Sequence, residues 1–237
     1  MTTATILKMR WVLMAVLCLA LAGCGSGIQY QWNQKYTVTI DTPEGVKSAS
    51  SVVELTYVDN TENPEFGSGH VHKFRLRGEA IAMQVKHDKY LFVLLTSNGR
   101  EYDAFEEFSK QLGYLRAEYS KIAPQLQGSN LQTTLLENDP MLVTFDDISK
   151  PETVKRVDPK NLAASFGAGY ALKSITMEIT DEPVTEGRVD RMLGWLARVG
   201  RERSSLKPYP KGVKSSELED PQLQLLSPLA FSTELYK

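Results

Sequence analysis

The sequence has only two cysteines, Cys18 and Cys24, and no long run of apolar side chains. Its apolar stretch from Trp11 to Ala22 has about 12 residues, whereas a helix that crosses a bilayer needs about 20. A permanent membrane span is therefore disfavoured. If residues 1–23 are removed as a secretory signal, one cysteine remains and no intramolecular disulfide can form. An apolar core must then stabilise the exported chain without a covalent cross-link.

Sequence motifs of several enzyme classes are also missing. There is no G-x-S-x-G elbow, no phosphate loop with G-K-[ST], no G-x-G-x-x-G fingerprint and no H-E-x-x-H zinc motif. The charges are mixed and nearly balanced, with 27 Lys and Arg against 29 Asp and Glu. This balance lacks the basic stripe of a nucleic-acid binder, and it disfavours a second contact with anionic lipid headgroups. We therefore expect no catalytic residue, no cofactor and no nucleic-acid partner.

The N-terminal segment has the three parts of a secretory signal, with Lys8 and Arg10 before the apolar run and small residues after it. The four residues Leu21-Ala22-Gly23-Cys24 resemble the lipobox of bacterial lipoproteins. In that family the cysteine thiol forms a thioether with a diacylglycerol, a signal peptidase cuts before the cysteine, and the new amino group is acylated. The resemblance implies lipidation of Cys24, and three acyl chains hold a protein stably at a membrane. The alternative is that Cys24 is only a small apolar residue at the end of the signal.

The same resemblance implies a location. An Asp directly after the cysteine tends to retain such lipoproteins in the inner membrane, and this sequence has Gly25 there. The expected location is thus the outer membrane of a bacterial envelope, facing the periplasm. Segments of the mature chain such as "DTPEGVKSASSVVEL" and "VDPKNLAASFGAGYALKSITMEITDEPVTEG" also resemble uncharacterised bacterial envelope proteins. That similarity implies a folded domain and brings no activity with it.

The first part of the mature chain alternates between apolar and polar residues, which is typical of half-buried strands. Residues 30–58 read as a hairpin around the turn "TPEG", residues 59–69 as a polar loop, and residues 70–85 as one long strand. A turn at 87–89 leads to a fourth, apolar strand. We expect an antiparallel meander of four strands.

Beyond Gly99 the apolar residues recur at intervals of three and four, which predicts one amphipathic helix of roughly 22 residues ended by Pro124. Its aromatic stripe is expected to pack against the meander rather than to bind a ligand. The stripe consists of Tyr102, Phe105, Phe108, Leu112, Leu115, Tyr119 and Ile122.

The rest of the domain contains four more strand candidates, at 131–137, 141–145, 153–157 and 170–180. A second, short helix is predicted over 188–199, with Gly200 as its stop. This order of elements indicates an α+β fold with an antiparallel sheet.

The predicted organisation is a signal peptide over 1–23, a β-rich domain over 24–200 and a proline-containing extended tail over 201–237. Within that tail, "LQLLSPLAF" at 223–231 is too apolar to remain in water, so we expect it to pack on the domain or to await a partner.

Few side chains suggest chemistry. His70 and His72 would lie on one face of a strand, about 6.5 to 7 Å apart, which would allow both to bind one metal ion. His87 lies at the far end of that strand, so a third ligand is missing and no metal site is expected. The carboxylate pairs Asp146-Asp147 and Asp181-Glu182 could share a proton or hold a metal, but such pairs are also usual in turns and caps.

These observations favour a lipid-anchored envelope protein that acts as a non-enzymatic binding or structural module, with another envelope protein as a candidate partner. One alternative is a periplasmic metal-dependent hydrolase that uses His70, His72 and a carboxylate such as Asp146 or Asp181. Another is a lipoprotein that binds a small ligand in a β-rich pocket.

Overall fold

The computed structural model divides the chain into two compact units, of which residues 30–57 and 74–237 form the larger one. The signal peptide, Cys24 and His70 lie outside the described residues, so the predictions for them stay predictions. None of the helices in the described ranges is both long and apolar enough to cross a bilayer. The structure describes residues 28–60, 72–97, 100–101, 105–114, 118–135, 140–202 and 205–235.

The predicted hairpin at the start of the domain is confirmed, and it forms the centre of a five-stranded sheet. Strands β1 (Ile28–Thr42) and β2 (Gly45–Asp59) are neighbours in the order β3-β2-β1-β11-β8. The Thr42 hydroxyl closes the turn, because it donates to the carbonyl of Gly45 at 2.7 Å and accepts from the amide of Glu44. The other strands of this sheet are β3 (His72–Arg77), β8 (Gln132–Thr134) and β11 (Ala171–Thr180).

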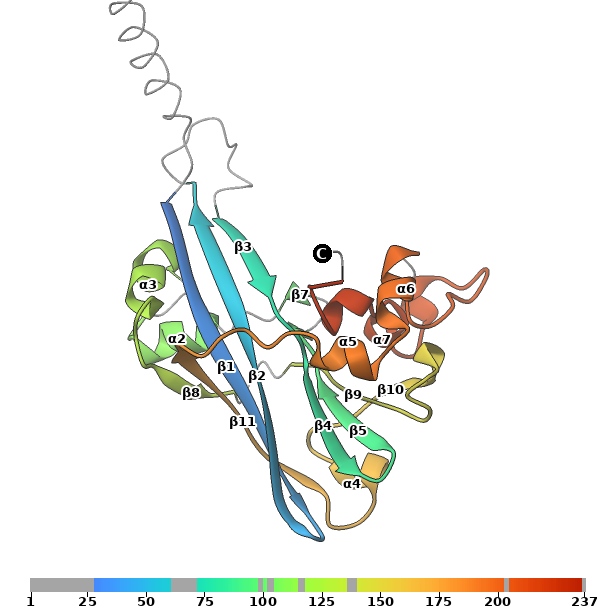
Figure 1. Ribbon diagram of the computed structural model, residues 1–237. Helices are drawn as coiled ribbons and strands as arrows, with labels where there is room; N and C mark the ends of the chain where they lie inside the picture. Colours follow the sequence, from blue (N-terminus) through green and yellow to red (C-terminus); the bar gives the residue numbers. More distant parts are fainter. Residues whose placement is uncertain are drawn as a thin grey trace, which may run out of the picture. The chain divides into compact units, whose positions relative to one another are not determined.

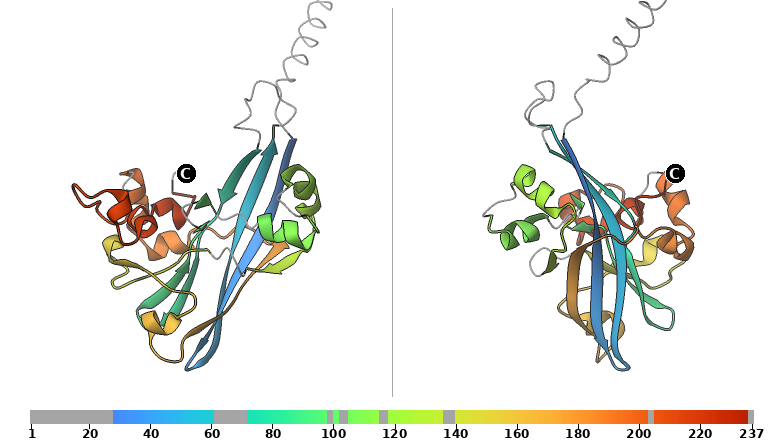
Figure 2. Two further views of the ribbon diagram at one scale, coloured as in Figure 1. Left: turned by 180° about the vertical axis from the view of Figure 1, so that it is seen from behind. Right: turned by 60° about the vertical axis from the view of Figure 1, so that its left-hand side comes forward.

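A second sheet has the order β10-β9-β5-β4 and is buried on both faces. One face, which includes Leu91 and Val93, belongs to the core shared with the first sheet. The opposite face, which includes Phe92 and Leu94, packs in a separate core with the C-terminal helices. In Figures 1 and 2 the second sheet accordingly lies between the first sheet and the helices α5 (Arg188–Met192), α6 (Leu196–Arg201) and α7 (Pro221–Gln224). Its strands are β4 (Ile81–Lys86), β5 (Lys89–Val93), β9 (Leu142–Phe145) and β10 (Val154–Arg156), and β6 (Thr96–Ser97) pairs with β7 (Arg100–Glu101).

The prediction of a single meander of four strands is wrong, because the predicted third strand is divided at Gly78 between the two sheets. The backbone of Gly78 has φ +141°, and a Cβ atom there would lie 2.9 Å from Cγ1 of Val53. Glycine therefore permits both the sharp change of direction and the close approach to β2. The chain leaves the first sheet at β3 and enters the second at β4.

The prediction of one long amphipathic helix is also wrong, since the described residues form two short helices, α2 (Phe105–Gln111) and α3 (Tyr119–Leu126). Gly113 takes φ +82° after α2, its amide donates to the carbonyl of Lys110, and the amide of Tyr114 donates to that of Ser109. This pattern is a Schellman C-cap, which ends a helix. Pro124 lies inside α3 instead of after it. The expected packing of the stripe is confirmed for Phe105, Phe108 and Ile122, which are buried in the core.

The predicted helix over 188–199 is likewise split, into α5 (Arg188–Met192) and α6 (Leu196–Arg201). Leu193 leaves the helical conformation at φ −107° and ψ 66°, and the predicted stop, Gly200, lies within α6. The four later strand candidates are confirmed as β8 to β11. The other short elements are α4 (Leu162–Phe166) and the 3-10 turns η2 (Pro151–Thr153) and η3 (Ser215–Glu217).

The C-terminal segment is not an extended tail in its described part. It contains α7 (Pro221–Gln224) and η4 (Pro228–Ala230), and it buries Leu223, Leu226 and Phe231 in the second core. The expectation that 223–231 packs back on the domain is confirmed. The fold is thus α+β, with mostly antiparallel strands in two sheets and short helices.

Candidate functional site

The structure does not bring the histidines together into a metal site. His72 is exposed at the first position of β3, and His70 lies outside the described residues. His87 is exposed in the turn between β4 and β5, where its Nδ1 lies 2.7 Å from the carboxylate of Asp88. Within the described ranges, no group of three or more His, Cys, Asp or Glu residues could hold a metal ion.

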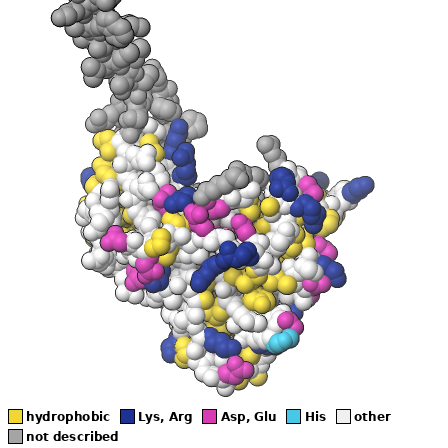
Figure 3. Space-filling model, in the orientation of Figure 1, with side chains coloured by type: hydrophobic (Ala, Val, Ile, Leu, Met, Phe, Trp, Pro, Cys, Tyr) yellow, Lys and Arg dark blue, Asp and Glu magenta, His cyan; other side chains and the backbone are white. Residues whose placement is uncertain are grey.

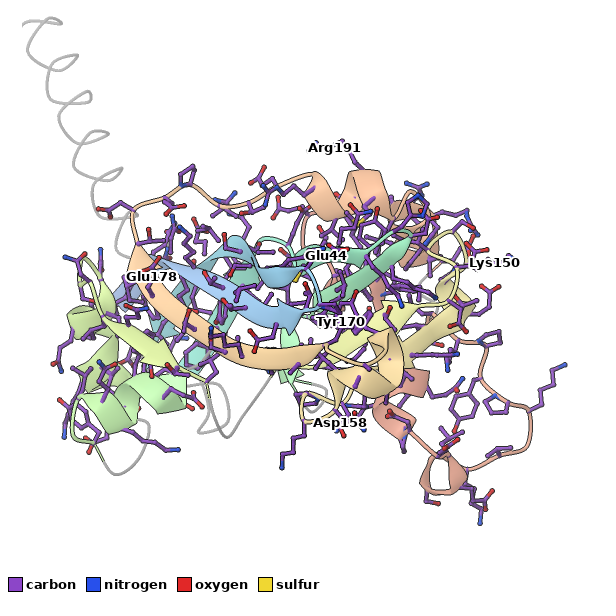
Figure 4. The ribbon with its side chains drawn as sticks, turned by 90° about the horizontal axis from the view of Figure 1, so that it is seen from below. Glu44, Lys150, Asp158, Tyr170, Glu178 and Arg191 are labelled. Carbon is purple, nitrogen blue, oxygen red and sulfur yellow. The ribbon has the colours of Figure 1, made fainter. Side chains whose placement is uncertain are left out.

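The carboxylates of Asp146 and Asp147 are engaged in the turn that follows β9. Asp146 pairs with Lys155 at 2.6 Å, and the hydrogen bond from Lys155 lowers the pKa of that carboxyl. Asp147 accepts from the hydroxyl and the amide of Ser149 and pairs with Lys150, which lowers its pKa to about 2. Lys150 is labelled in Figure 4. Both groups stay ionised near neutral pH, so neither is suited to act as a general acid.

In the second carboxylate pair, Asp181-Glu182, Glu182 holds the segment after β11 in place. The Glu182 carboxylate lies 2.5 Å from Nζ of Lys35, and the Glu182 backbone carbonyl accepts from the side chain of Asn33 at 2.8 Å. Both partners belong to β1, so these contacts hold the chain beside the first sheet. Asp181 is exposed. The contacts of Asp146, Asp147 and Glu182 are those of turns and surface ion pairs, which was the alternative to a proton-sharing or metal-binding role.

An apolar cavity of about 370 Å³ lies under the C-terminal segment, and sequence reasoning did not find it. One side comes from the end of β3, from Thr96 of β6 and from residues that flank β5 and β9, and the other side comes from α7, η4 and the residues around them. None of the described residues that line it carries a charge. They are Leu76, Leu95, Thr96, Met141, Pro221, Gln222, Leu225, Leu226, Ser227, Leu229, Ala230 and Thr233.

Two leucines at this cavity are exposed to solvent in spite of their size. Leu225 is 56% exposed and Leu229 is 44% exposed. Their neighbours Leu223 and Leu226 are buried in the second core, so the apolar run contributes both to the core and to the cavity. The only sequence signal for the site was this run of leucines, which seemed too apolar for a free tail.

One end of the covering segment is held by an ion pair. The Arg156 guanidinium on β10 donates to both carboxylate oxygens of Asp220, at 2.6 and 2.9 Å, and to the side chain of Gln222 at 3.0 Å. Asp220 also caps α7 by accepting from the amide of Leu223. The hydrogen bond from Arg156 lowers the pKa of Asp220, so the pair stays charged at neutral pH.

The other end of the segment, at residues 230–233, forms hydrogen bonds around Gly78. This is where the chain passes from β3 to β4, and it is called the strand crossing below. The amide of Ala80 donates to the carbonyl of Phe231, and the amide of Leu95 donates to that of Ala230, both at 2.9 Å. Gly78 and Thr233 exchange two further bonds, from Thr233 N to Gly78 O and from Gly78 N to the Thr233 hydroxyl. The segment beside the cavity therefore has one end held by several backbone hydrogen bonds at Gly78, and another end held by the Arg156–Asp220 ion pair and by buried leucines.

A buried carboxylate supports this crossing. Glu79 is fully buried, and its oxygens accept from the amides of Gly187, Arg188 and Val189 at 2.7, 2.8 and 3.1 Å. Burial, and then the charge of Glu79, raise the pKa of the nearby Asp190. In the described structure the Oδ1 atom of Asp190 is buried without a hydrogen-bond partner. These groups hold α5 against the crossing and do not line the cavity.

A smaller cavity beside Glu79 has a volume of about 20 Å³, which leaves room for about one water molecule. It is too small for a ligand, so the candidate site is the larger cavity. Comparison of the chain with protein-family models, with curated proteins and with solved structures found no match.

Proposed function

We propose that this protein is a lipid-anchored, non-enzymatic binding module of the bacterial cell envelope, and that its cavity takes an uncharged hydrocarbon chain. The single observation that carries the proposal is the cavity under residues 221–233. Its volume of about 370 Å³ lies at the lower end of the range of about 300 to 1,000 Å³ found for small-ligand sites. A cavity of about 150 Å³ already holds a benzene ring, so a longer hydrocarbon group fits here.

The lining determines the chemistry of the ligand. Its side chains are mainly aliphatic and carry no charge, so a charged group that entered the cavity would lose its hydration without gaining a partner. A hydrocarbon chain would instead bury apolar surface, and it would cover Leu225 and Leu229, which are exposed in its absence. The polar side chains of the lining, Gln222, Ser227 and Thr233, already form hydrogen bonds within the protein, so the contacts left for a ligand are apolar.

The lipobox supports the cellular part of the proposal. Lipidation of Cys24 would hold the domain at the periplasmic face of the outer membrane, where hydrocarbon chains are available. The lack of catalytic motifs supports binding rather than turnover. Another envelope protein that carries such a chain, or that presents apolar side chains of similar size, would be a partner of the same cavity.

The proposal is tested on the full chain in lipid nanodiscs with a neutral long-chain alcohol that carries a photoreactive diazirine. After illumination, mass spectrometry locates the labelled residues. We expect saturable labelling around Met141 and residues 221–233, since these line the cavity. Labelling that is spread over the surface, or that does not saturate, would contradict the proposal.

A matched pair of variants controls this experiment. Leu225→Asp places a charge at the cavity, whereas Val46→Asp places one on the β1–β2 hairpin, and the two native side chains are both 56% exposed. We expect Leu225→Asp to reduce specific labelling at least about tenfold, because a hydrocarbon chain would have to desolvate the new carboxylate. Val46→Asp should label like the native chain, and an equal loss in both variants would count against the cavity.

A further inference from the structure

The loop after α6 contains several lysines close together, although positive and negative residues are nearly balanced over the whole chain. Residues 207–214, "KPYPKGVK", contain Lys207, Lys211 and Lys214 and no acidic residue, in a chain whose net charge is −2. Figure 3 shows several Lys and Arg side chains over α6 and the loop that follows it, with Asp and Glu side chains among them. The charge of this eight-residue stretch is therefore opposite in sign to that of the protein as a whole, although Glu217, Glu219 and Asp220 follow it and the Glu217 carboxylate accepts from the amide of Lys214.

The three lysines of this loop are available for a partner. In the described part of the chain their ammonium groups form no ion pair, whereas lysines elsewhere, such as Lys35 and Lys155, pair with carboxylates. Lys211 and Lys214 are exposed, and Lys207 is half-buried. The loop projects away from the sheets in Figure 4, which leaves room for a broad surface to approach it.

The backbone of the loop is held in place at its base. The Gln224 side chain donates to the carbonyl of Pro208 at 2.7 Å, and the Ser205 hydroxyl donates to that of Lys207 at 2.6 Å. Leu206 is buried, and its amide donates to the carbonyl of Leu226. Pro208 further restricts the chain. Binding through this loop would therefore cost little backbone entropy.

An aromatic side chain accompanies the charges. Tyr209 is 43% exposed between two prolines of the loop. A tyrosine ring has an apolar body and a polar end, a combination that is enriched at the boundary between lipid hydrocarbon and water. Lysines around an exposed tyrosine fit a surface of phosphate groups above hydrocarbon better than they fit the base edges of a nucleic acid.

We propose that the loop 205–214 binds the anionic headgroups of phospholipids and so forms a second membrane contact beside the lipid anchor. Each lysine close to an anionic membrane strengthens binding about fivefold, so three together contribute on the order of 100-fold. That contribution is too weak to localise the protein alone, but it is sufficient to orient an anchored domain. The contact uses residues outside the cavity and does not depend on its ligand.

The test uses the full chain in nanodiscs of phosphatidylcholine alone or of equal parts phosphatidylcholine and phosphatidylglycerol. A water-soluble acylating reagent measures the accessibility of each lysine by mass spectrometry. We expect labelling of Lys207, Lys211 and Lys214 to fall about tenfold or more in the anionic nanodiscs and to recover at high salt, which screens exposed charges. Lys160 and Lys173 are also exposed and without an ion pair in the described structure, so they serve as internal controls.

A set of variants separates the loop from other effects. Exchanging Lys207, Lys211 and Lys214 for Gln should abolish the protection of the loop backbone from hydrogen exchange in anionic nanodiscs, while Lys160→Gln with Lys173→Gln should preserve it. Equal labelling in both lipids, or protection that appears only with an acidic protein or a nucleic acid, would overturn the proposal. If the chain does not stay in the nanodiscs, the anchor fails. The labelling is then repeated with free vesicles of both compositions at about 10 mM accessible lipid, a concentration at which a contact of about 100-fold strength forms without the anchor.

Discussion

At the scale of single residues, the protonation of the Asp190 carboxyl group is linked to the free energy of unfolding. Burial and the charge of Glu79 raise its pKa, so the folded chain binds this proton more tightly than the unfolded chain does. The stability that comes from the proton is present at low pH and is lost as the pH rises above the ordinary range of an aspartate. At neutral pH the folded protein therefore carries an unfavourable charge within α5.

We predict that Asp190→Asn raises the free energy of unfolding at pH 7 by about 0.5 to 1 kcal/mol, a modest value because Asp190 is only partly buried and its charge is screened. The amide stays neutral at every pH, so its advantage over the native chain should shrink in acid. Urea unfolding at pH 7 and pH 4 measures both values. A loss of stability of the same size at both pH values would show that the carboxyl group has a structural role instead.

At the scale of elements, the segment that covers the cavity is held unequally at its two ends. The end at Phe231 forms backbone bonds with the strand crossing, whereas the end at α7 relies on the Arg156–Asp220 pair and on buried leucines. Charge pairs near the surface contribute about 1 kcal/mol or less and weaken with salt. Local unfolding of this segment should therefore begin at α7.

We predict that Arg156→Gln increases hydrogen exchange about threefold to fivefold in residues 221–227, since it removes the bidentate contact with Asp220. Exchange around Phe231 should not change, because that end is held by other bonds. Arg198→Gln is the matched control, because Arg198 forms an exposed ion pair with Glu202 at the end of α6, at 3.8 Å. An equal response at both ends of the segment would contradict unequal anchoring.

At the scale of the whole molecule, the expected behaviour depends on the N-terminal cysteine. Cys24→Ser should prevent thioether formation, because a hydroxyl does not replace the nucleophilic thiol. We predict that the variant leaves the membrane fraction or accumulates unprocessed at a larger size, and fractionation with immunoblotting measures both. A variant that stays with the membrane at the native size would disprove the lipidation of Cys24.

Several elements could be read from the sequence because their burial is periodic. Over most of their length, β1 and β11 alternate between buried and less buried residues, and this period of two indicates strands. Strand β2 is less regular, because residues 51–53 and 55–57 are buried in succession. The packing of Phe105 and Phe108 followed from the helical pattern of their stripe. Periodicity reports which side of an element is buried, and it does so from a few consecutive residues.

The ends of elements and their assignment to sheets were not predictable in the same way. The period of three and four continues through Gly113, although the chain turns there, because packing brings both halves of the stripe to one core. Residues 70–85 read as one strand, but close contact between Gly78 and Val53 divides it between two sheets. Such contacts join residues far apart in the chain, so no local pattern contains them.

The sequence by itself determined the secretory pattern, the resemblance of the Cys24 region to a lipobox, the α+β class and the apolar character of 223–231, since each depends on neighbouring residues. Only the tertiary structure decided that this apolar run covers a cavity and that the charged pairs at Asp146 and Glu182 are engaged in ion pairs. A cavity exists where strand ends and a distant segment meet without filling the space between them. Its volume is a property of that packing, which sequence patterns do not record.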